Sequence, residues 1–117
     1  MKNVRAIFSP EAEEVFRYLN REAANSKTER TILNAVKSKI GLIKANIHYG
    51  DPIGKDLIPK EYKEKYGINN LFRVELPNYW RMLYSLTNDE NKIEIIAFIL
   101  DLINHDQYNK KFGYKKK

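Results

Sequence analysis

Two short segments in which every second residue is apolar constrain the fold of this chain most strongly. Residues 71–76 read LFRVEL and residues 80–86 read WRMLYSL, with Pro-Asn-Tyr at positions 77–79 between them. A period of two is typical of strands that bury one face, and a proline–asparagine pair between two such runs is typical of a turn. The sequence therefore predicts two consecutive antiparallel strands.

A three-residue loop at positions 77–79 predicts the register of this hairpin. It pairs Glu75 with Arg81 and Arg73 with Leu83. A two-residue loop would mix charged and apolar residues on each face, because a slip of one residue turns every side chain over. With the longer loop, the apolar residues share the face toward the helices: Phe72, Val74, Leu76, Trp80, Met82 and Tyr84. Two arginines and a carboxylate then share the opposite face.

This group of charges has two interpretations. An exposed cross-strand pair of Glu75 with Arg81 would contribute a few tenths of a kcal/mol to about 1 kcal/mol and have no further role. Alternatively, Arg73 and Arg81 form a phosphate-binding site, because guanidinium groups keep their charge and offer a rigid fork of donors that matches phosphate. The pair taken alone favours the ion-pair interpretation, because such pairs are common.

Helices are predicted before this hairpin. Residues 4–9 read as a first strand, and Ser9, Pro10 and Glu11 then provide an N-cap, a first-turn proline and a first-turn acid. Apolar residues at helical spacing follow. A second helix is predicted at residues 27–46, and the two helices are expected to pack as an antiparallel pair joined by a short turn.

The remaining segments complete an α+β pattern. Residues 48–70 predict a long loop that contains one or two helical turns ending at Gly67. Residues 92–103 predict a strand after a turn at 88–91, and its two apolar faces indicate a central position. A short helix is expected at about 105–112. The order β-α-α-β-β-β-α predicts one domain over residues 1–117, with a curved antiparallel sheet packed on an N-terminal helical hairpin.

Composition restricts the functional classes. The chain has 117 residues, a net charge of +6 and no cysteine, which excludes disulfides and thiolate metal sites. The two histidines, His48 and His105, have no carboxylate cluster at ligand spacing, so we expect no metal and no cofactor. No apolar stretch approaches the ~18 residues of a membrane span, and no signal peptide is evident, so we expect a cytoplasmic protein. The basic charge favours an anionic partner such as nucleic acid.

Three segments together resemble a known family. They are GDPIGKDL at 50–57, LFRVELPNYWRMLYSL at 71–86 and HDQYNKKFGY at 105–114. This combination resembles the RelE/ParE superfamily of type II toxin–antitoxin toxins. The resemblance implies a ribosome-dependent mRNA endonuclease in which a ribose 2′-OH attacks the adjacent phosphate without a metal. It also implies three partners, namely a cognate antitoxin, the ribosome and mRNA.

The resemblance also implies roles for individual residues. Arg81 matches the strand arginine that contacts the scissile phosphate, and Arg73 lies in the preceding strand, where members often place a basic residue. His105 is the acid–base candidate, since the unperturbed pKa of imidazole is about 6.5. Tyr108 would stack on a base or orient the phosphate. Further contacts to the substrate are expected from Lys55, Lys110, Lys111 and Tyr114.

Two departures from the family pattern keep alternatives open. Glu75 beside Arg73 weakens the positive field where active members carry more basic residues, and it has a further interpretation as a general base. Members of the superfamily that inhibit DNA gyrase share the fold without the nuclease residues. The alternatives are therefore a non-enzymatic toxin that binds a protein target, or an inactive relative that binds RNA or the ribosome.

Overall fold

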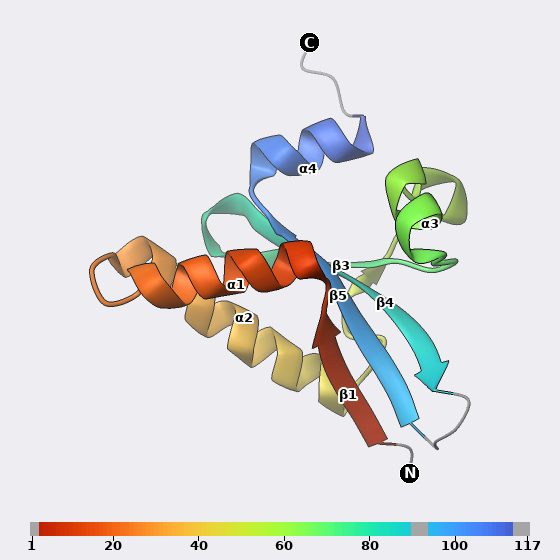
Figure 1. The fold of residues 1–117 in the computed structure, drawn as a ribbon, viewed down its shortest axis with the longest axis horizontal. Coiled ribbons are helices and arrows are strands. Elements are labelled where there is room, and N and C mark those ends of the chain that lie inside the picture. Colours follow the sequence, from red (N-terminus) through yellow and green to blue (C-terminus); the bar gives the residue numbers. More distant parts are fainter. Residues whose placement is uncertain (1–2, 90–93, 114–117) are drawn as a thin grey trace.

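A five-stranded sheet with the order β1-β5-β4-β3-β2 forms the centre of the protein (Figure 1). We describe it from a computed structural model, in which residues 3–89 and 94–113 are described. The strands are β1 (Asn3–Phe8), β2 (Asp51–Pro52), β3 (Phe72–Leu76), β4 (Trp80–Asp89) and β5 (Glu94–Ile103). The predicted central position of the last strand is confirmed, because β5 lies between β1 and β4.

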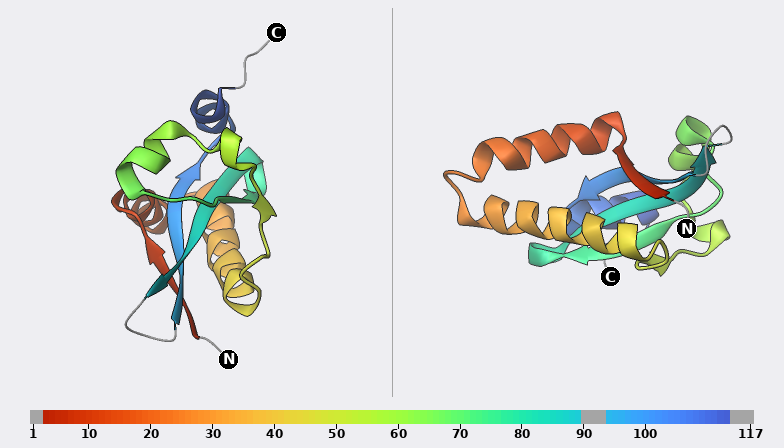
Figure 2. Two further views of the ribbon diagram at one scale, coloured as in Figure 1. Left: turned by 90° about the vertical axis from the view of Figure 1, so that its right-hand side faces the viewer. Right: turned by 90° about the horizontal axis from the view of Figure 1, so that it is seen from below.

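Four α-helices accompany the sheet. They are α1 (Pro10–Glu22), α2 (Lys27–Ala45), α3 (Lys60–Tyr66) and α4 (His105–Phe112), with 3-10 turns η1 (Lys55–Leu57) and η2 (Pro77–Tyr79). The pair α1–α2 runs antiparallel, as the right-hand view of Figure 2 shows. The predicted α+β class and N-terminal helical hairpin are therefore confirmed. In the described part of the chain, every helix falls short of the length or the hydropathy that spanning a bilayer requires.

The hairpin of β3 and β4 has the predicted register. Glu75 pairs with Arg81 and Arg73 pairs with Leu83, across a loop of three residues. Two of these loop residues, Asn78 and Tyr79, have positive φ angles of 60° and 61°. The left-handed conformation costs an L-residue other than glycine or asparagine about 1–2 kcal/mol. The turn that sets the register therefore holds Tyr79 in a strained backbone conformation.

The sheet differs from the prediction at β1. We expected an antiparallel sheet, but β1 pairs with β5 in parallel. The pairs β5–β4, β4–β3 and β3–β2 are antiparallel, as expected. Parallel neighbours require a long crossover, which the α1–α2 hairpin and the segments after it provide. The predicted loop at 48–70 is also more ordered than expected. It contains the short edge strand β2 and the helix α3, which ends at Gly67 as predicted.

Both faces of the sheet carry a core. The face toward α1 and α2 buries residues that include Phe72, Val74, Met82 and Tyr84. The opposite face is covered by α3 and α4, whose positions at the upper end of the sheet are visible in Figure 1. The buried side chains of this second core are Ile58, Tyr62, Leu71, Leu83, Leu100, Ile103 and Tyr108. The arginine-bearing face is therefore partly buried rather than solvated.

Ser9 connects three elements at the end of β1. Its backbone N–H donates to Ile99 O at 2.8 Å, and its hydroxyl donates to Leu100 O at 2.7 Å. The same hydroxyl accepts from the N–H of Ala12 at 3.0 Å, so Ser9 is the predicted N-cap of α1. Its side chain is fully buried. One hydroxyl thus joins the start of α1 to the central strand.

We expect Ser9→Ala to destabilise the fold by about 2–3 kcal/mol, because it removes a helix cap and leaves the buried Leu100 carbonyl without its partner. Urea unfolding followed by circular dichroism measures this change. Ser26→Ala is the matched control, since Ser26 is the N-cap of α2 and is only half-buried. It should cost about 1 kcal/mol. Equal losses in the two variants would contradict the connecting role of Ser9.

Candidate functional site

Arg81 lies beneath the aromatic ring of Tyr108. The centre of its guanidinium group is 4.9 Å from the ring centroid, within the range of a cation–π interaction. One terminal nitrogen, Nη1, donates to the backbone oxygen of Tyr79 at 2.5 Å. The Arg81 side chain is only 13% exposed, so these contacts fix its position.

Arg73 reaches the same tyrosine from the neighbouring strand. Its Nη1 donates to the Tyr108 hydroxyl at 3.2 Å, and its side chain is 34% exposed. The hydrogen bond with Tyr108 and the charges of Glu75 and Asp51 raise the pKa of Arg73, against the opposing effect of burial. Arg73 therefore stays charged at any physiological pH, and it shares Tyr108 with Arg81.

Two carboxylates face these arginines. Glu75 has its oxygens 3.5 Å from Nε of Arg73 and 3.5 Å from Nε of Arg81, and Asp51 lies 3.8 Å from Nη2 of Arg73. Neither buried Nε atom makes a hydrogen bond in the described part of the chain. Both distances from Glu75 are long for ion pairs, and the Glu75 side chain is 57% exposed, so its contacts with the arginines are partly solvated. Both Nε donors are shielded from solvent, so an oxyanion would reach them only if a neighbouring group moved.

The helix α4 brings Tyr108 and His105 to this face. Asn104 and Gln107 form a capping box at its start, and Tyr108 stacks on Phe112 with ring centroids 4.4 Å apart. His105 is the first residue of the helix and is exposed. Its ring lies 6.1 Å from the Tyr79 ring, and its Nε2 lies 3.2 Å from Nδ2 of Asn109.

The four predicted catalytic residues are therefore placed unequally. Arg73, Arg81 and Tyr108 are in direct contact, while His105 lies at the rim beside Tyr79. Within residues 3–89 and 94–113, no hydrogen bond joins His105 to either arginine. The link between His105 and Arg81 runs through Tyr79, whose ring neighbours His105 and whose backbone oxygen accepts from Arg81. We name the group of Arg73, Arg81 and Tyr108 the arginine–tyrosine cluster.

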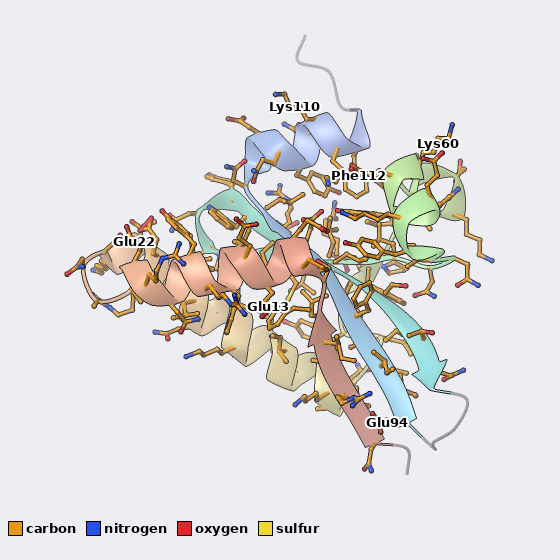
Figure 3. All side chains as sticks on the ribbon, in the orientation of Figure 1. Glu13, Glu22, Lys60, Glu94, Lys110 and Phe112 are labelled. Atoms are coloured by element: carbon orange, nitrogen blue, oxygen red, sulfur yellow. The ribbon has the colours of Figure 1, made fainter. Side chains whose placement is uncertain are left out.

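The predicted substrate-binding lysines have different surroundings. Lys111 is turned toward α3, with its Nζ 3.0 Å from Asp101, 3.1 Å from Glu61 and 4.9 Å from the centroid of the Tyr62 ring. Lys55 and Lys110 are exposed, and Figure 3 shows Lys110 on the outer side of α4. Tyr114 lies outside the described residues.

Asp101 anchors both covering helices, a role that the sequence did not indicate. A β-bulge between β4 and β5 pairs Leu83 with Asp101 and Tyr84 with Ile99. Asp101 is buried and accepts hydrogen bonds from the Tyr62 hydroxyl and from Lys111. Burial and the charge of Asp101 raise the pKa of the Tyr62 phenol, so Tyr62 stays a donor. The available signal was a single carboxylate within the apolar run of β5.

Lys39 and Tyr49 lie beside Arg73 on the surface. They line a surface cavity of about 250 Å³ together with Gly50, Asp51, Arg73, Val74 and Glu75. Lys39 Nζ donates to the Tyr49 hydroxyl at 3.0 Å. Sequence reasoning missed Lys39, because it lies on α2 at a position that no motif marks.

Comparisons with known proteins do not assign a family or a function. No family model, no curated protein and no solved structure matches this chain. In the part of the chain that the structure describes, no three or more histidine, aspartate or glutamate side chains group so as to hold a metal ion. The site is therefore characterised by its own side chains alone.

We expect Asp101→Asn to destabilise the protein by about 2–4 kcal/mol, because it removes the buried carboxylate and leaves the partly buried Lys111 with only the exposed Glu61 as an ion-pair partner. Thermal or urea unfolding measures the loss. Asp56→Asn is the control, since Asp56 is exposed in η1, and it should change stability by less than about 0.5 kcal/mol. A neutral effect of Asp101→Asn would show that α3 and α4 are held by apolar packing alone.

Proposed function

We propose that this protein is a toxin of the RelE/ParE type that cleaves messenger RNA on the ribosome. The observation that carries the proposal is the convergence of Arg73 and Arg81 on Tyr108, at a partly buried position of the sheet. Three segments that resemble the superfamily supply two strands, a loop and a helix of this region. The proposed partners are a cognate antitoxin, the ribosome and mRNA, and the proposed compartment is the cytoplasm.

The proposed reaction is a transesterification of RNA. The ribose 2′-oxygen attacks the adjacent phosphorus, the bond from phosphorus to the 5′-oxygen breaks, and the products are a 2′,3′-cyclic phosphate and a 5′-hydroxyl end. One proton leaves the 2′-hydroxyl and one reaches the 5′-oxygen. The pentacoordinate phosphorane develops extra negative charge, which fixed positive donors stabilise more than they stabilise the ground state.

Each member of the site has a role in this reaction. Arg73 and Arg81 bind the non-bridging phosphate oxygens, because their forks are preorganised by Tyr108 and by the Tyr79 carbonyl. Tyr108 keeps the two guanidinium groups together through its hydroxyl and its ring. His105 exchanges a proton with the reacting oxygens, since imidazole titrates near neutral pH. An RNA strand bound at the rim would meet its exposed ring.

A second candidate function is RNA or ribosome binding without cleavage. Glu75 and Asp51 favour it, because two carboxylates beside two arginines balance the charge of the unliganded site. For the nuclease, Glu75 must move aside when a phosphate binds, and its exposed side chain can do so. A non-enzymatic toxin that binds a protein target such as DNA gyrase would not use His105 at all. Measuring cleavage separates the nuclease from both alternatives, and measuring ribosome binding separates the alternatives from each other.

We expect the wild-type protein to cut a reporter mRNA in a reconstituted translation reaction. The cleavage should require ribosomes. Arg81→Ala should lower the cleavage rate about 100- to 1,000-fold, as removal of an oxyanion donor does in other enzymes. His105→Ala should lower it about 100- to 10,000-fold, as loss of an acid–base group does. Primer extension that maps the new 5′ ends measures both effects.

Arg21→Ala is the matched control, because Arg21 is an exposed arginine on α1 and outside the arginine–tyrosine cluster. It should cleave like the wild type. Circular dichroism establishes that each variant is folded. Intact message with folded wild-type protein would reject the nuclease, and salt-sensitive binding to ribosomes without cleavage would then support the second candidate.

A further inference from the structure

Tyr79 combines a strained backbone with an exposed aromatic ring. Its φ angle is 61°, and it follows Asn78, which is also left-handed. Among the described large hydrophobic side chains it is the most exposed, at 74%. Glycine or asparagine would form this turn with less strain, and a polar side chain would suit the exposure better. Neither the turn nor the core therefore explains a tyrosine at this position.

The surroundings of Tyr79 link it to the candidate site. Its backbone oxygen accepts from Nη1 of Arg81 at 2.5 Å. Tyr79 is therefore itself a residue that holds this guanidinium group in place. On the other side its ring centroid lies 6.1 Å from that of His105, with the planes tilted by 59°. An exposed aromatic ring thus lies beside the proposed acid–base residue, on the residue whose backbone oxygen binds Arg81.

Strained backbone at functional sites is maintained when the surrounding contacts determine it. Here the Arg81 hydrogen bond and the 3-10 turn η2, whose last residue is Tyr79, hold Tyr79 in its left-handed conformation. The direction in which the Tyr79 side chain leaves the backbone is therefore fixed before any ligand binds. Preorganisation of this kind lowers the entropy that binding must overcome.

We propose that Tyr79 is a base-stacking residue, which holds the base of one nucleotide of single-stranded RNA while Arg73 and Arg81 hold the neighbouring phosphate. This inference deepens the proposed function and rests on it. An unpaired base offers an apolar face that stacks on exposed aromatic rings, whereas a duplex keeps its bases covered. Stacking on a π-face accepts any base, so Tyr79 would add affinity with little sequence preference.

The test uses binding of an eight-nucleotide single-stranded RNA with 2′-O-methyl groups, which cannot be cleaved by attack of the 2′-oxygen. Fluorescence anisotropy at low salt gives the dissociation constant. We expect Tyr79→Gly to weaken binding roughly 5- to 100-fold, the usual range for one lost base stack. Tyr79→Trp should retain the affinity, because it keeps an aromatic face.

The loss of binding in Tyr79→Gly is expected without a loss of stability. Tyr79→Gly should leave the urea midpoint unchanged or raise it, because glycine adopts a positive φ without strain. Tyr18→Ala is the matched control, since Tyr18 is an exposed tyrosine on α1, and it should bind RNA like the wild type.

The outcomes separate this inference from the proposed function. If wild type binds RNA, Arg81→Ala weakens it and Tyr79→Gly does not, the stacking role is overturned and the phosphate site stands. If Tyr79→Gly loses affinity only because it unfolds, its urea midpoint will be lowered. That result contradicts the expected stability and overturns the inference. If folded wild-type protein binds neither this RNA nor ribosomes, both the inference and the proposed function are overturned.

Discussion

The structure depends on the need to bury both faces of its sheet. Leu83, Leu100 and Ile103 project from the side opposite the α1–α2 hairpin, and they would be exposed if nothing covered that side. Each fully buried side chain of this size contributes about 1.5–3 kcal/mol relative to its exposed state. The helices α3 and α4 provide the cover, and Asp101 binds both of them through Tyr62 and Lys111. The position of α4 then decides which side chains meet the arginines.

The arginine–tyrosine cluster follows from this second core. Tyr108 is buried with its ring against Phe112 on one side and the Arg81 guanidinium group on the other. Its hydroxyl remains available to Arg73. A tyrosine suits such a position, because its ring packs as an apolar group while its hydroxyl serves a polar partner. The same residue therefore stabilises the fold and holds two cations at one place, although like charges repel.

Much of the fold was predictable because local signals agreed with one another. The hairpin register followed from the alternation of apolar residues, and the start of α1 followed from Ser9 and Pro10. The parallel pairing of β1 was not predictable, because alternation within a strand does not specify the direction of its neighbour. Within the site, the meeting of Arg73 with Arg81 was predictable from register, whereas the capture of Lys111 by Asp101 was not. The bulge on β5 beside Asp101 and the position of α4, which carries Lys111, decide that contact, and neither has a sequence signature here.

The central strand of the sheet has a consequence for synthesis of the protein. β5 is the last of the described strands, yet β1 and β4 both pair with it. The hydroxyl of Ser9 and the carbonyl of Leu100 are 91 positions apart in sequence, so the contact order of the N-terminal strand is high. The nascent chain can form the α1–α2 pair early, but the sheet lacks its central strand until β5 emerges. The sheet, and with it the face that carries the arginines, is therefore completed only after β5 has been synthesised.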